Sequence, residues 1–208
     1  MKPFPEMNTA NSALLVIDVI NSSANEKCEI PEWGIHFSKI RMMVPRLARF
    51  IEEYRNKIGG LIVFTKNVPW TKEYLAENIN NLYSDSRFAY YSKDTTGFPE
   101  QFYGIEPKEN DLVIVKNTND AIANPALEED LQKRGIKYIV IAGAFTDGCV
   151  LATVAGGFSK GYNFVVLRDL VETTDVPIRQ NIQKELLDHT FPYLFARVVN
   201  ANELLESW

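Results

Sequence analysis

Three residues with chemically useful side chains, Asp18, Lys116 and Cys149, each come at or just after the end of an apolar run. A thiol becomes a strong nucleophile as the thiolate, and a carboxylate can accept the thiol proton and later donate it to a leaving amine. An ammonium group beside them would stabilise the negative charge. Each residue alone is more typical of a loop cap, a solvated lysine or a small buried thiol. Their occurrence together predicts nucleophilic catalysis.

The loop Gly143–Cys149 adds to this expectation because it leads into a predicted helix. The first turn of a helix lowers a thiol pKa through unpaired N–H groups and the helix dipole. We therefore expect the helix start and Lys116 to favour a Cys149 thiolate. The backbone N–H groups of the same loop are candidates for an oxyanion hole.

Other sites that these residues could build do not match the sequence. Gly143–Gly148 has the glycine spacing of a phosphate-binding loop, but Cys149 stands where that motif needs Lys. The chain has two histidines, His36 and His189, and neither lies near a predicted strand end. A Cys–His enzyme and a histidine-based metal site are therefore not expected. We expect no metal and no cofactor.

The elements that must position the three residues alternate along the chain. Five nearly continuous apolar runs are typical of strands buried on both faces of a parallel sheet. They are Ala13–Ile17, Leu61–Phe64, Leu112–Val115, Tyr138–Ala142 and Phe164–Leu167, with Ala196–Val199 as a weaker sixth. Helical patterns cover Ile40–Tyr54, Pro125–Lys133, Cys149–Lys160 and Ile178–His189. This alternation predicts an α/β fold with a doubly wound sheet. Ligands bind such sheets at the carboxyl ends of the strands, where Asp18, Lys116 and Cys149 would meet.

The segment Val68–Pro107 interrupts the alternation with many aromatic residues and a short helical pattern at Lys72–Leu82. A long excursion of this kind is often a lid or a subunit contact. We expect Trp70 and Tyr90, together with Phe145 of the loop before Cys149, to bind substrate. The alternative is that these rings only pack the loop or an interface.

The length, net charge and cysteine content of the chain limit the expected number of domains, the classes of partner and the cellular compartment. The 208 residues fit a single domain over residues 1–208, and the net charge of −5 argues against nucleic acid or an anionic membrane as a partner. Met1–Ser12 has no signal-peptide pattern, and neither cysteine belongs to a disulfide framework. We expect a cytoplasmic homo-oligomer, a dimer or tetramer, that acts on a small molecule. Cys28 lies in a loop that offers no activating partner.

These motifs resemble those of the isochorismatase-like hydrolases, which include nicotinamidase, N-carbamoylsarcosine amidase and ureidoacrylate amidohydrolase. The resemblance is carried by Ala13–Asp18, Gly97–Lys116 and Val140–Val150, and it extends from Ser12 to Asn200. It implies a three-layer α/β/α sandwich around a six-stranded, mostly parallel sheet.

The resemblance also implies roles for single residues. Cys149 would be the nucleophile, Asp18 the general base and then acid, and Lys116 the cation of a catalytic triad. A cis peptide bond would join Ala144 and Phe145. The N–H groups of Phe145 and Cys149 would form the oxyanion hole.

Departures from the family narrow the expected reaction. Nicotinamidases carry a histidine-containing metal cluster after the second strand, but Thr65–Trp70 contains no histidine. Isochorismatases proper lack the cysteine, so Cys149 favours amide chemistry. We expect hydrolysis of a C–N bond in a small amide, ureido or carbamoyl compound. A vinyl-ether hydrolase and a non-catalytic binding domain on the same fold remain the alternatives.

Gly156 and Gly157, inside the predicted helix, indicate close packing or room for a neighbouring side chain.

Overall fold

The computed structural model describes residues 2–87 and 89–208, so Phe88 of the aromatic excursion lies outside the described residues. Six parallel strands form one sheet in the order β3-β2-β1-β4-β5-β6. They are β1 (Ser12–Ile17), β2 (Leu61–Asn67), β3 (Leu112–Lys116), β4 (Tyr138–Ala144), β5 (Asn163–Glu172) and β6 (Ala196–Val199). The predicted doubly wound α/β sheet is confirmed, including the weaker sixth strand.

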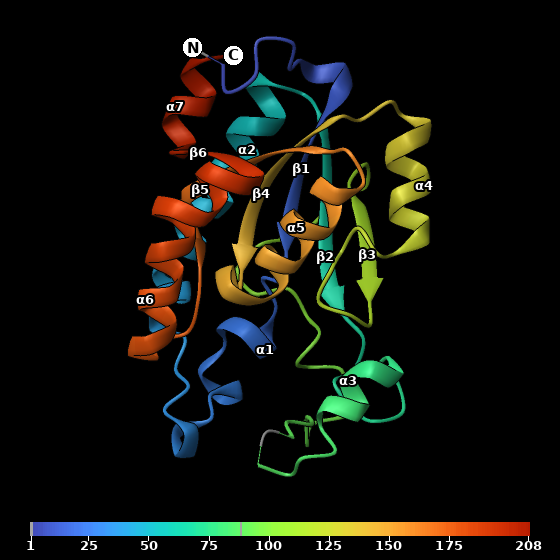
Figure 1. Cartoon of the computed structure of the whole chain (residues 1–208), viewed down its shortest axis with the longest axis vertical. Helices are drawn as coiled ribbons and strands as arrows, with labels where there is room; N and C mark the ends of the chain where they lie inside the picture. Colours follow the sequence, from blue (N-terminus) through green and yellow to red (C-terminus); the bar gives the residue numbers. More distant parts are fainter. Residues whose placement is uncertain (1, 88) are drawn as a thin grey trace.

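Helices cover both faces of the sheet (Figure 1). The α-helices are α1 (Asn21–Ala24), α2 (Ser38–Lys57), α3 (Glu77–Leu82), α4 (Pro125–Lys133), α5 (Leu151–Ser159), α6 (Pro177–Glu185) and α7 (Ala201–Glu206). Short 3₁₀ turns are η1 (Thr9–Asn11), η2 (Glu26–Cys28) and η3 (Pro31–Trp33), and π-helical segments are η4 (Thr146–Val150) and η5 (Leu186–Phe195). The buried residues of α2 and α7 belong to one core, and those of α4, α5 and η5 belong to the other.

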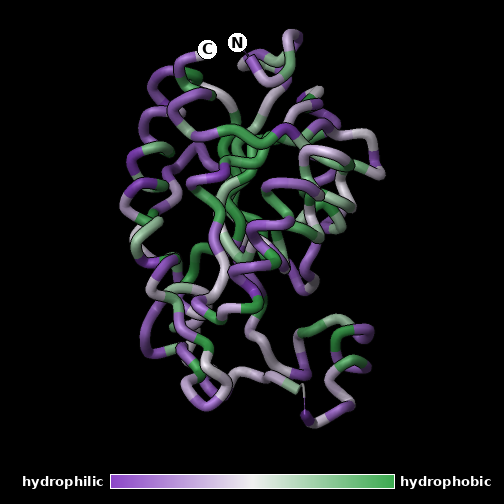
Figure 2. Tube along the Cα trace, turned by 60° about the vertical axis from the view of Figure 1, so that its left-hand side comes forward, coloured by the Kyte–Doolittle hydropathy of each residue, from purple (hydrophilic) through white to green (hydrophobic). Residues whose placement is uncertain are grey.

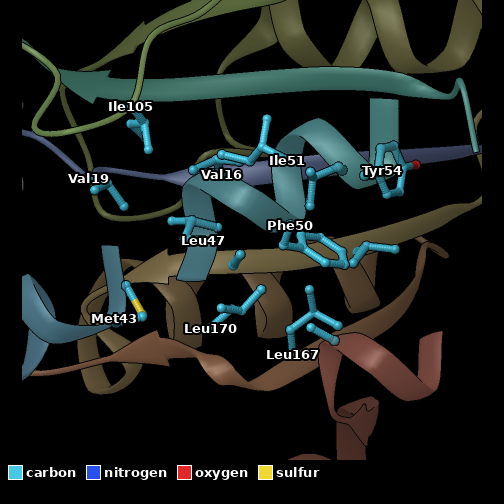
Figure 3. Close-up of a cluster of buried hydrophobic side chains, with 14 of the residues drawn as sticks. Val16, Val19, Met43, Leu47, Phe50, Ile51, Tyr54, Ile105, Leu167 and Leu170 are labelled. Atoms are coloured by element: carbon cyan, nitrogen blue, oxygen red, sulfur yellow. The ribbon is translucent and has the colours of Figure 1, made fainter. Parts of the chain in front are cut away.

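Strand β1 shows why nearly continuous apolar runs are needed in a sheet of this kind. Leu14 and Val16 belong to the core beneath α2 and α7, part of which Figure 3 shows. Ala13, Leu15 and Ile17 belong to the core on the opposite face. Successive side chains of a strand point to opposite faces, so a strand buried on both faces has no place for polar alternation. Hydrophobic residues accordingly gather along the central strands, with hydrophilic residues on the surrounding helices (Figure 2).

The order of the strands places a topological switch point between β1 and β4. The chain first winds outward from β1 through β2 to β3, and then from β4 through β5 to β6 on the other side. Ligands bind open α/β sheets outside the carboxyl ends of the strands at this point. The strand arrows of β2 and β3 point toward the end of the molecule where α1 and α3 lie (Figure 1).

Some element boundaries differ from the predicted ones. Strand β5 continues to Glu172, well beyond the apolar run, and β2 continues to Asn67. The helical pattern predicted over Lys72–Leu82 forms a helix only from Glu77, because turns occupy the preceding residues. Within the described part of the chain, no helix combines the length and the apolar character needed to cross a bilayer.

Candidate active site

The structure brings Asp18, Lys116 and Cys149 together at the carboxyl edge of the sheet. Lys116 Nζ lies 2.7 Å from Asp18 Oδ2 and 3.3 Å from Cys149 Sγ. All three residues are buried, with exposed fractions of 3% for Asp18, 2% for Lys116 and 8% for Cys149. An acid, a cation and a thiol from distant parts of the sequence therefore form one contact group.

Asp18 is held by hydroxyl groups from two neighbouring elements. It directly follows β1 with a φ of 47°, in the left-handed region that aspartate tolerates better than most residues. Thr65 Oγ1 of β2 donates a hydrogen bond of 2.7 Å to Asp18 Oδ1, and the Asp18 backbone N–H donates to the same hydroxyl at 3.2 Å. Ser23 of α1 donates to the Asp18 carbonyl oxygen. Sequence reasoning missed both hydroxyls, since serine and threonine are too common to signal such contacts.

Lys116 ends β3 and pairs in register with Asn67 of β2. Its ammonium donates to Asn67 Oδ1 at 2.7 Å and to the carbonyl oxygen of Thr118 at 3.0 Å, besides its contacts with Asp18 and Cys149. Burial alone would lower the pKa of Lys116, but the Asp18 carboxylate and Cys149 outweigh burial and raise it. Lys116 is therefore a fixed positive charge.

Cys149 differs from the sequence expectation in its protonation state. Burial and the neighbouring Asp18 carboxylate raise the pKa of the Cys149 thiol to about 12, against an opposing effect of Lys116. Cys149 also lies in the π-helical segment η4, next to Gly148 with its non-helical φ of −126° and ψ of −107°. A regular helix start is therefore absent at this residue. The raised pKa favours a neutral thiol over the expected thiolate in the resting site, where Cys149 Sγ lies 3.8 Å from Asn119 Oδ1.

The end of β4 approaches β1 closely just before the loop that carries Cys149. Gly143 has a φ of 117°, and a Cβ atom added there would lie 2.1 Å from the carbonyl oxygen of Ile17. Only glycine fits this position. The peptide bond between Ala144 and Phe145 is cis. The loop thus begins beside the residue that precedes Asp18.

The loop is also held from outside by α6 and by the residue that follows β5. Asp147 accepts two hydrogen bonds of 2.6 Å from Arg179 and one of 2.5 Å from Thr173. The Arg179 guanidinium lies 4.9 Å from the centre of the Phe145 ring, and that ring stacks on Phe37. Sequence reasoning did not identify this ion pair because its partners are far apart in the chain.

A cavity of about 910 Å³ opens above Cys149. Its lining includes Phe145, Trp70 and Tyr90, the three residues predicted to bind substrate. Trp70 donates through Nε1 to the Tyr83 hydroxyl at 3.1 Å. Part of the excursion Val68–Pro107 is therefore a wall of the cavity that contains the thiol.

Cys28 lines the same cavity, a position that its sequence context did not indicate. Burial, together with Asp94 and Glu100, raises the pKa of its thiol. Lys116 donates to Cys149 instead. The two cysteines share a cavity but differ in their partners.

The metal cluster of nicotinamidases has no counterpart among the residues that the structure describes. Thr65 and Asn67, in the segment where that cluster would lie, instead contact Asp18 and Lys116. Across residues 2–87 and 89–208, no group of three or more His, Cys, Asp or Glu side chains is arranged to hold a metal ion.

Gly156 and Gly157 allow α5 to pack closely, as their place inside a helix indicated. A Cβ atom on Gly156 would lie 2.1 Å from Asp120 Oδ2, and one on Gly157 would lie 2.5 Å from Phe164 Cζ. The missing Cβ of Gly156 leaves room for Asp120, in the loop that also carries Asn119, which contacts Cys149.

Comparison with known proteins gives consistent matches over most of the chain. The isochorismatase domain family model matches residues 12–203. The secreted isochorismatase effector Isc1 of Verticillium dahliae is 25% identical over 170 residues, which cover 82% of this chain and 77% of that protein. The ureidoacrylate amidohydrolase RutB of Variovorax paradoxus is 24% identical over 176 residues, covering 78% of this chain and 69% of that protein.

Solved structures show the same fold. The cysteine hydrolase from Pseudomonas syringae pv. phaseolicola superposes with a TM-score of 0.81 at 16% identity, covering 99% of this chain and 96% of that one. The likeness in fold thus extends over nearly the whole length of both chains.

Proposed function

We propose that this chain, which belongs to the isochorismatase family of hydrolases, cleaves a C–N bond of a small amide, ureido or carbamoyl compound. The reaction would pass through a thioester on Cys149. The observation that carries this proposal is the contact of Lys116 with both Asp18 and Cys149 at the base of a cavity. These are the groups needed for nucleophilic acyl transfer.

The resting thiol requires that proton removal accompany attack. The Asp18 carboxylate accepts the Cys149 proton while Sγ forms a bond to the substrate carbonyl carbon, and the carbonyl π electrons move to oxygen. We assign the N–H groups of Phe145 and Cys149 to the resulting oxyanion. Asp18 then returns the proton to the nitrogen as the C–N bond breaks, and the amine or ammonia leaves a thioester behind.

Water completes the cycle by the reverse use of the same acid and base. Asp18 accepts a proton from water while the water oxygen attacks the thioester carbonyl carbon. The C–S bond then breaks, the sulfur takes the proton from Asp18, and a carboxylic or carbamic acid leaves. Lys116 keeps its charge throughout because its pKa is raised, and it balances whichever of Asp18 and Cys149 is negative.

One relative favours the amide class, although Isc1 is an isochorismatase by name. The similar protein from Variovorax paradoxus is a ureidoacrylate amidohydrolase by name. Vinyl-ether hydrolysis needs no cysteine nucleophile, whereas Cys149 lies in contact with the fixed charge of Lys116. A non-catalytic binding domain would need neither the buried ion pair nor the thiol.

A screen for ammonia release tests the proposed activity. The protein is incubated with a panel of small amides, ureides and carbamoyl compounds, with Cys149→Ser as the inactive control and Cys28→Ser as the matched cysteine control. We expect release with at least one compound by the parent and by Cys28→Ser, and none by Cys149→Ser. Release that persists in Cys149→Ser would overturn the covalent mechanism.

We also propose a cytoplasmic homo-oligomer, as the sequence led us to expect. Cys28 and Cys149 are both free, which suits a reducing compartment. The relative Isc1 is secreted by name, so secretion is the competing location. Cell fractionation tests the location, and light scattering on the purified chain tests for a dimer or tetramer.

A further inference from the structure

The wall of the cavity opposite the sheet combines aromatic rings with carboxylates. Trp33, Trp70, Tyr90 and Tyr91 line it, and so do Asp94 and Glu100. Aromatic faces attract cations through their quadrupole, and a carboxylate within the same enclosure adds to this attraction. Such a lining favours a ligand that carries a positively charged nitrogen.

Among the described acids that line this cavity, Glu100 is the one with a buried carboxylate oxygen that lacks a hydrogen-bond partner. Glu29 is paired with Arg41 at 2.7 Å, and Asp94 accepts hydrogen bonds from Thr96 at 2.6 and 2.8 Å. Glu100 Oε2 is buried and has no hydrogen-bond partner within the described part of the chain. An unsatisfied buried acceptor costs free energy, which a ligand that supplies a donor can recover.

The backbone places Glu100 next to the segment that follows Asp18. Asn21 donates its backbone N–H to the carbonyl oxygen of Gln101 at 2.8 Å, and Ser22 donates to that of Pro99 at 2.9 Å. These bonds flank Glu100 on both sides, so its backbone is fixed relative to the end of β1. The terminal torsion of a glutamate is soft, so rotation of the carboxylate can turn either oxygen toward the cavity.

Charged groups of both signs lie around Glu100. Burial and Asp94 raise the pKa of its carboxyl, while a hydrogen bond from the Glu100 backbone N–H and the charge of Lys66 act in the opposite direction. Lys27 and Lys93 also line the cavity, but both are exposed. Lys27 directs its ammonium to the Phe98 ring at 5.6 Å. If these lysines instead held an anionic substrate, an anionic probe would bind more tightly than a cationic one.

We propose that the substrate is a cationic amide: Glu100 binds its ammonium or guanidinium group between the aromatic rings while its carbonyl group meets Cys149. This inference rests on the proposed function only where it places the carbonyl group of the substrate at Cys149. It extends that function by adding a charge requirement, which distinguishes this site from one built for a carboxylate-bearing substrate such as ureidoacrylate.

Calorimetric titration of the Cys149→Ala protein tests the charge preference without turnover. Three probes of similar size carry the same amide: para-(aminomethyl)benzamide is a cation, para-ethylbenzamide is its neutral isostere, and terephthalamate is an anion. We expect the cation to bind about ten-fold or more tightly than the neutral isostere, the factor that one charge-assisted hydrogen bond supplies. The anion should bind most weakly. Equal binding of cation and isostere, tighter binding of the anion, or binding of none of the three overturns the inference.

Glu100→Gln, made in the Cys149→Ala protein, assigns the preference to one carboxylate. This variant keeps the shape and removes the charge, so the advantage of the cation over the isostere should disappear. Glu109→Gln is the matched control, because Glu109 is exposed and lies outside the cavity lining. It should leave the advantage intact. A preference that survives Glu100→Gln refutes the role of Glu100.

The same data separate this inference from the proposed function. Binding is measured in a protein without the nucleophile, so a cation preference that depends on Glu100 stands even if the parent hydrolyses no amide. Conversely, ammonia release from neutral or anionic amides alone would support the proposed function and refute the charge requirement.

Discussion

Lys116 Nζ lies 2.7 Å from Asp18 Oδ2 while both side chains are almost completely buried. Removing one member of a buried ion pair leaves the other charge unpaired, which is strongly destabilising. The pair also contacts Cys149. Burial and Asp18 raise the pKa of the Cys149 thiol, and Lys116 lowers it. The pKa of the Cys149 thiol therefore reports on both of its charged neighbours.

Replacing Cys149 should abolish turnover without loss of the fold. Cys149→Ser keeps nearly the same volume, so the melting temperature should change little, while hydrolysis should fall to background because no thioester can form. Activity and thermal unfolding are measured on the same preparation. Cys28→Ser is the control in the same cavity, and we expect it to keep its kcat, because Cys28 lacks the Lys116 contact. Substantial turnover by Cys149→Ser would show that the nucleophile lies elsewhere.

Alkylation of Cys149 by iodoacetamide should be slow at neutral pH and should accelerate toward pH 12. The pKa of about 12 means that only a small thiolate fraction exists near pH 7. Asp18→Asn removes the repulsion and should lower the alkylation pKa, whereas Lys116→Met removes the attraction and should raise it. Mass spectrometry resolves Cys149 from Cys28 in each protein. A fast parent reaction at neutral pH would show that substrate-free Cys149 is already a thiolate.

Asp18→Asn and Lys116→Met should both lose activity, even though they shift the pKa of the Cys149 thiol in opposite directions. Asp18→Asn keeps the shape but cannot carry the proton, and general acid–base roles are worth about 10²–10⁴-fold. We expect kcat to fall by at least that order. Steady-state kinetics in parallel with the alkylation profiles measure this loss. Normal turnover by Asp18→Asn would refute its assignment as the acid and base.

Chelators should leave the activity unchanged. Thr65 and Asn67 hold Asp18 and Lys116 where nicotinamidases hold their metal cluster, so no metal is expected in the reaction. The protein is dialysed against EDTA and assayed before and after addition of zinc, manganese or iron. Activity that is lost on dialysis and restored by one of these ions would contradict this prediction.

The fold and the meeting of the three reactive residues were predictable, whereas the state of the thiol was not. Continuous apolar runs specify buried parallel strands, and the carboxyl ends of such strands share one edge, so Asp18 and Lys116 were expected at the same edge of the sheet. The pKa of Cys149 depends on burial and on the distance to a carboxylate, which spacing in the sequence does not encode. The position of Glu100 likewise depends on backbone bonds to Asn21 and Ser22. Loop conformations of this kind are set by tertiary contacts.

Replacing Gly156 with alanine should destabilise the protein, although the same exchange stabilises most helices. Exchanging Gly for Ala inside a helix ordinarily stabilises by about 1 kcal/mol. At Gly156 the new Cβ would lie 2.1 Å from Asp120 Oδ2, so we expect Gly156→Ala to destabilise by about 1–3 kcal/mol, as overpacking does. Asp120→Ala removes the obstacle. In that background Gly156→Ala should be neutral or stabilising, and the double-mutant cycle should show a large favourable coupling. Chemical denaturation of the four proteins measures it. Additive effects would show that the Asp120 carboxylate moves aside freely, and that the glycine is not needed for the close approach of α5 to the Asn119 loop.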